Sequence, residues 1–498
     1  MIKTIIRFIS YTCLCLLTLL LGSSLALAAG SHRGKAPFLA IGPQATLSGQ
    51  ATPQYGLFTC QVGLAAIPGE QCYDPYQMRH AYGVDSLINA GFDGTGHTIV
   101  IVDAFDYPPV AGFGPGLNAD LAFFTAFYGL PAANLTHVYP DGPTGFDPGW
   151  AGEMTLDVEW AHAIAPGANI VLVHALTNSD ADILNAIKYA VDNNLGDVIS
   201  MSFGENESCV DPDILAGYHD AFAAATLKGI TLFASSGDEG AAQTTCDGNS
   251  WVKAASSPAS DPLVTGVDGT ELHAADYCLT VLGCNPAANP LPGTWLSEIV
   301  WNEGAPYGDF QDVFGLGTIA TGGGFSVLFD EPPYQKATLP GGNQRAVPDV
   351  AYNAAVLHGV LTRFRGHFFL FGGTSAGSPQ WAGITVIANQ KNGGRLGFLN
   401  KAIYQVGKVN KAYPASFHDI TSGVNSAVEF DSSNNPVNIV GFSAGTGWDA
   451  TTGFGSPIDT SLVDYLIRYV SPGDGVAAIA TTKHSIGAAR VPGHMDPH

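Results

Sequence analysis

The sequence predicts an α/β fold, a doubly wound and mainly parallel sheet with helices on both faces. Four nearly continuous apolar runs follow one another along the chain, at 97–104, 169–175, 197–204 and 230–238. Such runs are typical of parallel strands that are buried on both sides. Two segments with helical periodicity lie between them, and right-handed crossovers should place these helices on both faces.

The two predicted helices occupy residues 180–194 and 212–228, and the second ends at Gly229, which suits a C-terminal cap. Polar side chains mark the carboxyl ends of three strands: Asp103, Ser202 and Asp238. In doubly wound folds, functional sites gather at this edge of the sheet. We therefore expect these three residues to lie near a site.

The charge balance limits the partners of the chain. Its 498 residues include 43 acidic against 20 basic side chains, a formal net charge of -23. This charge argues against nucleic acid and an anionic membrane as partners. Protonation of carboxylates in acid would relieve the self-repulsion, so the composition suits an acidic medium.

The N-terminus has the pattern of a secretory signal peptide, predicted at residues 1–28. Lys3 and Arg7 precede an apolar run, and the small-residue site at 26–28 reads A-L-A. An uncleaved membrane anchor is the alternative, but the sequence contains no second spanning run. We expect a secreted, extracellular protein that is not stably attached to a membrane and is a monomer.

Six cysteines remain after the signal peptide, an even number that favours disulfides in an exported chain. Pairing of neighbours is the simplest of several possible connectivities. The spacings typical of zinc sites, C-x-x-C or paired Cys and His, do not occur, so zinc is not predicted. The six are Cys60, Cys72, Cys209, Cys246, Cys278 and Cys284.

Composition divides the remaining chain into three parts. Residues 29–70 form a short N-terminal segment with little charge or periodicity, and 71–471 form one large domain. Within it, 245–345 is rich in Gly, Pro and Asn, which predicts long surface loops. Residues 472–498 lose periodicity and are predicted to be a flexible tail.

Ser375 is the candidate nucleophile. It follows the small residues Gly372, Gly373 and Thr374 and stands at the start of an apolar helical run, with Pro379 in the first turn. A helix N-terminus at this position favours developing negative charge. A helix-capping serine beside a glycine-rich turn is the structural alternative.

Glu153 and Asp157 are the candidate proton acceptors. The segment before Pro166 is helical, so these side chains, four residues apart, lie on one face. Two crowded acids titrate as a unit, and one can accept a serine proton at a pH where histidine is already charged. A solvated acidic helix start is the alternative, but Trp160 and its apolar neighbours make the helix partly buried.

Asp238 follows an apolar strand in a turn bracketed by Gly237 and Gly240, which would expose its carboxyl at the edge of the site. When protonated, this group could donate a hydrogen bond to an oxyanion; when ionised, it would repel one. A turn Asp that binds local backbone is the alternative.

Taken in order, these motifs resemble the sedolisin family of serine-carboxyl peptidases, which has a subtilisin-like fold. The serine motif G-G-T-S-A-G-S-P at 372–379 is close to the family's S-G-T-S-x-x-x-P, and the E-x-x-x-D pair precedes A-P-G at 165–167. None of the 14 His residues lies in the H-G-T-H segment of a subtilisin. The resemblance covers about residues 71 to 470, with an unusually short N-terminal region for this family.

By that resemblance, Ser375 is the nucleophile, Glu153 the general base, Asp157 its partner and Asp238 the residue facing the oxyanion. Glu159 and His162 lack the family spacing and are interpreted as ordinary helix residues. Asp103 is a further acid near the predicted site, outside this catalytic set.

The resemblance also implies one structural Ca²⁺ ion. The family site uses an Asp-Ile pair and a G-x-G-x-D run, both of which occur near the C-terminus. Carboxylates and backbone carbonyls in glycine-rich turns supply the oxygen ligands that calcium prefers. Carried over, the ligands are the Asp419 and Asp449 side chains and the carbonyls of Ile420, Gly445 and Gly447.

The expected function is therefore that of a secreted, acid-acting serine-carboxyl endopeptidase with protein or peptide substrates. A tripeptidyl-peptidase of the same family and a non-catalytic binding protein on the same fold are the alternatives. An esterase is excluded because it would need G-x-S-x-G and a His base.

Overall fold

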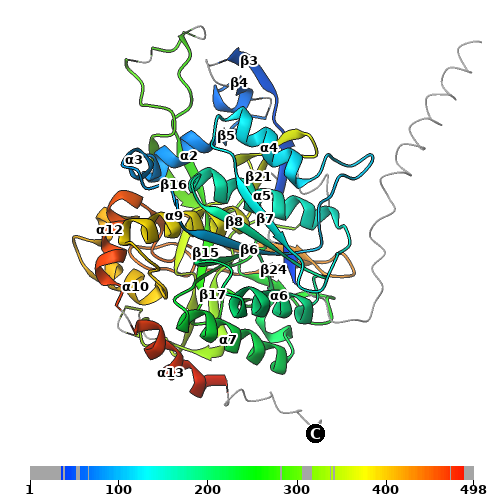
Figure 1. Ribbon diagram of the computed structural model, residues 1–498, viewed down its shortest axis with the longest axis vertical. Helices are drawn as coiled ribbons and strands as arrows, with labels where there is room; N and C mark the ends of the chain where they lie inside the picture. The colour runs from blue at the N-terminus through cyan, green and yellow to red at the C-terminus, as the bar shows by residue number, and fades with distance from the viewer. Residues whose placement is uncertain are drawn as a thin grey trace, which may run out of the picture. The chain divides into compact units, whose positions relative to one another are not determined.

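An eight-stranded, mainly parallel sheet lies at the centre of the computed structural model (Figure 1). The structure describes residues 35–486 except 38–39, 52–55, 66, 281–282, 286, 305–316, 337, 340–341 and 472. The predicted signal peptide at 1–28 lies outside the described residues. Among the described helices, none is long and apolar enough to cross a bilayer.

The strand order β16-β15-β11-β9-β6-β8-β7 contains all four strands predicted from apolar runs, and β19 also pairs with β15. The pairs are parallel except β15 with β16. The strands are β6 Thr98–Ala104, β7 Asn134–Val138, β8 Asn169–Ala175, β9 Val198–Met201, β11 Thr231–Ser235, β15 Thr265–Ala274, β16 Trp295–Val300 and β19 Val350–Asn353.

Helices cover both faces of this sheet, as predicted. Helices α5 and α9 contact each other and the central strands, while α6 and α7 pack together on β6, β8 and β11 from the opposite side (Figure 1). The helices are α2 Pro75–Tyr82, α3 Val84–Asn89, α4 Leu117–Phe127, α5 Pro148–Ile164, α6 Asp180–Asp192, α7 Pro212–Leu227, α9 Gly377–Asn392, α10 Asn400–Lys408, α11 Tyr413–Ser416, α12 Asp459–Tyr469 and α13 Asp474–Ile486.

Smaller sheets surround the central one. A four-stranded sheet has the order β2-β21-β20-β5, and a three-stranded sheet has the order β1-β10-β14. Their strands are β1 Ala36–Pro37, β2 Ala40–Gln44, β5 Gln71–Tyr73, β10 Phe203–Asn206, β14 Ser256–Ser257, β20 His358–Phe364 and β21 His367–Gly372. Two-stranded pairs comprise β3 Leu47–Ala51, β4 Gly56–Phe58, β12 Ala242–Thr244, β13 Trp251–Lys253, β17 Gly324–Asp330, β18 Gln344–Val347, β22 Phe417–His418, β23 Ala427–Phe430, β24 Pro436–Ile439 and β25 Ser456–Pro457.

Two sequence-based expectations differ from the structure. The region 245–345 was expected to form surface loops, yet it supplies β15, a buried strand of the central sheet. Some polar side chains of β15 are hydrogen-bonded in this buried position: Thr270 Oγ1, for example, donates a hydrogen bond to Glu298. Residues 472–498 were expected to be a flexible tail; within them, Asp474–Ile486 form α13, which contacts α7 and β17, and residues 487–498 lie outside the described part of the chain.

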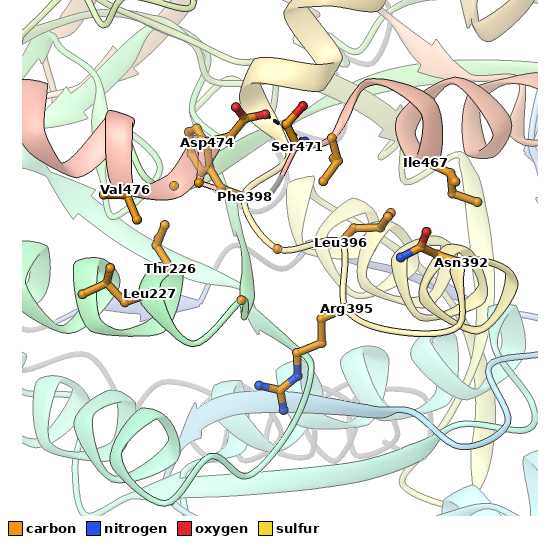
Figure 2. A pocket seen from close by; sticks show the side chains of 15 residues that line it. Thr226, Leu227, Asn392, Arg395, Leu396, Phe398, Ile467, Ser471, Asp474 and Val476 are labelled. Atoms are coloured by element: carbon orange, nitrogen blue, oxygen red, sulfur yellow. Dashed lines mark hydrogen bonds between the residues drawn. The ribbon is translucent and has the colours of Figure 1, made fainter.

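The start of α13 closes a cavity of about 380 Å³ that Figure 2 shows. The cavity lies between the ends of α7, α9 and α12, and Asp474 accepts a hydrogen bond from the Ser471 amide at its edge, 3.1 Å away. Arg395 reaches its wall, but the guanidinium is already bound to Asp197 and to three other acceptors: Asn194, Lys228 and Gly196. None of the candidate catalytic residues lines this cavity.

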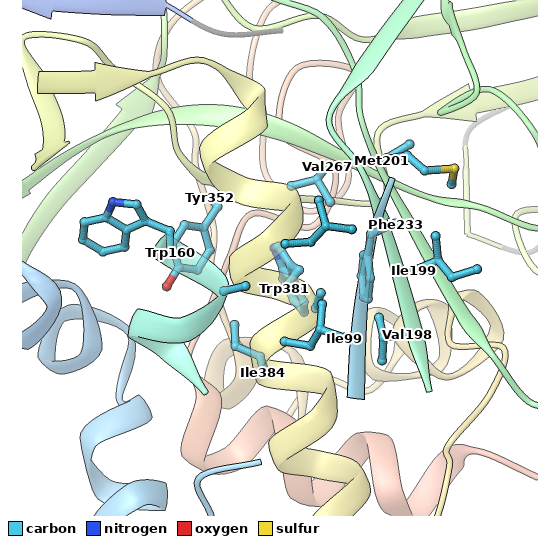
Figure 3. Packing of buried hydrophobic residues seen from close by; sticks show 14 of the residues in the cluster. Ile99, Trp160, Val198, Ile199, Met201, Phe233, Val267, Tyr352, Trp381 and Ile384 are labelled. Atoms are coloured by element: carbon cyan, nitrogen blue, oxygen red, sulfur yellow. The ribbon is translucent and has the colours of Figure 1, made fainter. Parts of the chain in front are cut away.

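The core between the sheet and α9 is apolar and closely packed. Trp381 of α9 stacks on Phe233 of β11 with ring centroids 6.1 Å apart, and aliphatic side chains of β6 and β9 surround the pair (Figure 3). The indole of Trp381 donates a hydrogen bond to the Ala351 carbonyl, 3.1 Å away. This packing fixes α9, and with it the loop that precedes the helix, against the carboxyl ends of the strands.

Three disulfides link neighbouring cysteines, the simplest of the pairings that the sequence allowed. They join Cys60 to Cys72, Cys209 to Cys246 and Cys278 to Cys284.

Candidate active site

Ser375 lies in a single 3₁₀ turn, η4 Thr374–Ala376, between β21 and α9. Glycines make this turn possible: Gly373 has a φ of 95°, and a Cβ on Gly372 would lie 2.4 Å from the Ala354 carbonyl oxygen. The hydroxyl of Ser375 donates to the Ser202 carbonyl at 3.4 Å. The serine therefore stands at the N-terminus of α9, beside the end of β9.

Helix α5 carries both candidate proton acceptors. Asp147 caps its N-terminus by accepting the amides of Gly149 and Trp150, and Glu153 and Asp157 follow one turn apart. Every residue from Trp150 to Ile164 is buried, because α4, α9, β6 and β20 all contact this helix. The sequence predicted a partly buried helix; in the structure, every residue after the first two is buried.

Glu153, Asp157 and Asp103 form a buried carboxyl cluster next to Ser375. Burial raises the pKa of Glu153 well above its usual value, and the charges of Asp157 and Asp103 raise it further, whereas the Ser375 hydroxyl lowers it. Burial and Asp103 likewise raise the pKa of Asp157. Such a cluster loses its protons in successive steps rather than at one pH.

Ser202 connects this cluster to Ser375. Its hydroxyl donates to Asp157 Oδ1 at 2.9 Å, while its carbonyl accepts from Ser375. Asp103, on β6, was predicted only to lie near the site; burial raises its pKa to about 8. The structure thus brings the Asp103 carboxyl into the same group of acids as the two α5 residues.

Asp238 contacts the turn that contains Ser375, through Thr374. Its Oδ1 accepts the Thr374 amide at 2.7 Å and the Thr374 hydroxyl at 2.9 Å. The second oxygen, Oδ2, is buried without a hydrogen bond to a described residue. Burial, and next the charge of Glu239, raise its pKa to about 8, so the carboxyl is protonated in acid and can donate from Oδ2.

The role of Thr374 was not recognised in the sequence. Thr374, the residue directly before Ser375, binds the Asp238 carboxyl, and its hydroxyl also accepts the Gly237 amide at 3.2 Å. The only signal for it was its position next to Ser375. By contrast, Glu159 lies outside the cluster, as predicted, and accepts the Arg363 amide at 2.8 Å. The ring of His162 is bound to the Pro131 carbonyl at 2.9 Å.

Two strand edges beside Ser375 pair with an extended segment of the same chain. Strand β1 pairs antiparallel with β10, which follows Ser202, and β2 pairs antiparallel with β21, which leads to Ser375. Lys35, directly before β1, is buried and binds Glu205 at 3.0 Å. In this structure β1 and β2 therefore occupy the backbone edges of β10 and β21 beside Ser375.

The two halves of the predicted metal site also meet. Asp419 accepts the Gly447 amide at 3.0 Å, and Asp449 accepts the Gly445 amide at 2.9 Å. A Cβ on either glycine would meet nothing within 4 Å, so there is open space beside both. Ile420 is buried directly after Asp419.

Comparison with known proteins gives consistent matches. The family model described as "Subtilase family" matches residues 149–412. Kumamolisin from Bacillus sp. (strain MN-32) is 34% identical over 413 residues, which cover 80% of this chain and 64% of that protein. Tripeptidyl-peptidase 1 from Rattus norvegicus is 28% identical over 375 residues, which cover 70% of this chain and 58% of that protein. The chain thus matches less than two thirds of each relative.

A solved structure matches as well. It is Pseudomonas sedolisin, a serine-carboxyl proteinase complexed with two molecules of pseudo-iodotyrostatin. It superimposes with a TM-score of 0.65 and 27% sequence identity, over 81% of this chain and all of that one.

Proposed function

Because the chain belongs to the subtilase family and, within it, to the sedolisins, we propose that it is a serine-carboxyl endopeptidase that acts in acid. The observation that carries the proposal is the convergence on Ser375 of two sets of buried carboxyls. Glu153 and Asp157 approach from α5, and Asp238 approaches from the end of β11. No histidine is needed in this arrangement, because a carboxylate can take the serine proton.

In the proposed reaction, Ser375 Oγ attacks the carbonyl carbon of the scissile peptide bond while its proton passes to Glu153. Asp157 shares a proton with Glu153, and the hydrogen bond from the Ser202 hydroxyl holds the Asp157 carboxyl in place. Protonated Asp238 donates from Oδ2 to the oxyanion of the tetrahedral intermediate. Glu153 then protonates the leaving amine, and water releases the acyl group from Ser375 by the same steps.

This chemistry sets the pH range of the enzyme. Glu153 must be able to accept a proton while Asp238 keeps its own, so the two sites need opposite protonation states. Since burial raises the pKa of Asp238 to about 8, the oxyanion donor is lost as the pH rises through that value.

Endopeptidase action is favoured over tripeptidyl release by the strand edges beside Ser375. Strands β1 and β2 show that both edges accept extended backbone, so a substrate chain that takes their place could extend to both sides of Ser375. A tripeptidyl-peptidase needs a boundary that limits the substrate to three residues on the N-terminal side. The similarity to tripeptidyl-peptidase 1 nevertheless keeps that activity as the second candidate.

We also assign the structural calcium ion to the two C-terminal loops. The Asp419 and Asp449 carboxylates face the Gly445–Gly447 turn and leave open space beside both glycines, which suits a hard cation with oxygen ligands. The Ile420, Gly445 and Gly447 carbonyls would complete the set. Bound calcium would hold the two loops together. Secretion, as expected from the sequence, agrees with the three disulfides.

Cleavage of an unfolded protein across the acid and neutral range tests the proposal, with Ser375→Ala as the inactive reference. We expect fragments in acid from the wild type alone. Peptides with a blocked N-terminus separate the two peptidase activities, because an endopeptidase cleaves them and a tripeptidyl-peptidase does not. A folded wild type that cleaves nothing at any pH would support the non-catalytic alternative instead.

A further inference from the structure

A second group of side chains, far from the catalytic residues in the sequence, has the composition of a metal site. Glu271 and His273 lie on one face of β15, and His358 begins β20. One ligand atom from each lies within 4.8 Å of the other two. Two imidazoles and one carboxylate are a common ligand set for Zn²⁺ and related divalent transition metals.

The distances between these atoms suit a tetrahedral ion. His273 Nε2 is 3.2 Å and His358 Nε2 is 3.8 Å from the same Glu271 oxygen, Oε1. Two ligand atoms that each lie about 2.1 Å from a tetrahedral zinc are roughly 3.4 Å apart. Small side-chain rotations would therefore be enough to place all three atoms around one ion.

The tautomer of His358 is already set for metal binding. Its Nδ1 lies 2.9 Å from the Leu272 carbonyl, which can only accept, so Nδ1 carries the proton. The Nε2 lone pair is then the one that faces Glu271. A backbone carbonyl that holds the far nitrogen of a histidine ligand is the usual support of a protein zinc site.

The solvent exposure of the three side chains and the strands that carry them also favour metal binding. The His273 side chain is 37% exposed and that of Glu271 is 13% exposed, so an ion can enter from solvent, while that of His358 is 6% exposed and anchors the inner side. Strand β20 also pairs with β5 and leads through β21 towards Ser375. An ion here would fasten this hairpin to the central sheet.

We propose that Glu271, His273 and His358 bind a divalent transition-metal ion of the zinc class, which cross-links β15 to β20. The site is separate from the calcium loops and does not depend on the proposed peptidase activity. The site could not be predicted from the sequence, because His358 lies on a different strand from Glu271 and His273 and no paired Cys or His spacing occurs. A water molecule can occupy the fourth coordination position of the ion, on the exposed side near His273.

A second His cluster supplies a matched control. Asp106, His137 and His174 also lie within 4.8 Å of one another. There, however, His137 Nδ1 and His174 Nε2 are 2.9 Å apart and share a hydrogen bond, while His174 Nδ1 is bound to the Phe105 carbonyl at 2.7 Å. Both ring nitrogens of His174 are already used in hydrogen bonds, so His174 has no lone pair left for an ion and we expect no tight metal binding by that cluster.

The test is calorimetric titration of the full chain with Zn²⁺ at neutral pH, in excess Ca²⁺ so that the calcium loops are saturated. We expect one Zn²⁺ per chain and a higher Tm. In His273→Gln and His358→Gln, affinity should fall by at least about tenfold, whereas His137→Gln should bind like the wild type. Circular dichroism checks that each variant is folded, and His273, the most exposed ligand, is the safest to replace.

Absence of Zn²⁺ binding in the wild type would overturn the assignment. So would unchanged affinity in the folded His273→Gln variant, or loss of binding in His137→Gln alone, because the ion would then be held elsewhere. None of these results bears on cleavage by Ser375, so failure here is distinguishable from failure of the proposed function.

Discussion

Replacing Asp238 by Asn should remove one component of the pH dependence of stability. The carboxamide oxygen can still accept both hydrogen bonds from Thr374, and its NH₂ group can take the place of the protonated Oδ2. The substitution therefore keeps the geometry of the turn but eliminates the titrating group. Whatever changes with pH between the two proteins can be assigned to this one carboxyl.

The size of the effect follows from the two pKa values of Asp238. Its pKa is 3.8 without the protein environment and about 8 in the fold. Below pH about 4 both states hold the proton, and above about 8 neither does. In between, only the folded state holds it, so the free energy of unfolding falls by about 1.4 kcal/mol per pH unit, on the order of 5 kcal/mol in all.

Urea unfolding at several pH values between 4 and 8 measures this slope, in a Ser375→Ala background that prevents autolysis. At the acid end, the parent and its Asp238→Asn variant should have similar stability. As the pH rises, the parent should lose stability more steeply, by about 1.4 kcal/mol per pH unit, so the variant is the more stable protein near neutrality. Parallel pH profiles, or a variant that is less stable near neutrality, would refute the reasoning.

Three further predictions follow from other contacts. Glu153→Gln should lower kcat by about 10²- to 10⁴-fold, whereas Glu159→Gln, on the same helix but outside the cluster, should change kcat little; steady-state kinetics in acid compares them. Replacing Asp419 or Asp449 by Asn should abolish the rise in Tm that Ca²⁺ gives the wild type, measured by calorimetry, and an unchanged calcium response would place the ion elsewhere. Arg345→Met should lower the free energy of unfolding by about 3 to 5 kcal/mol in denaturant titrations, because it leaves a buried carboxylate without its partner; a loss below about 1 kcal/mol would contradict this.

The sequence was most informative where a pattern is local. Apolar runs identified four strands of the central sheet. The separation of four residues between Glu153 and Asp157 placed both side chains on one helix face. The serine motif with its glycines located the turn of Ser375. Each of these features depends on neighbours in the chain, so periodicity and spacing were sufficient to predict it.

Features that depend on tertiary contacts were missed. Strand β15 has a polar sequence, and Thr270 is buried there only because partners such as Glu298 satisfy it. Helix α5 is buried from Trp150 to Ile164 because elements distant in the sequence, among them α9 and β20, pack against it. The contact of Thr374 with Asp238 joins residues 136 apart in the sequence. No local pattern carries that information.

Trapping of the acyl-enzyme tests the central claim most directly. A peptide ester would be mixed with the enzyme in acid, quenched within milliseconds and digested for mass spectrometry. The account predicts an acyl group on Ser375 in the wild type, much slower acylation in Glu153→Gln and none in Ser375→Ala. Turnover without acylation of Ser375, or acylation in Glu153→Gln as fast as in the wild type, would contradict the serine-carboxyl mechanism.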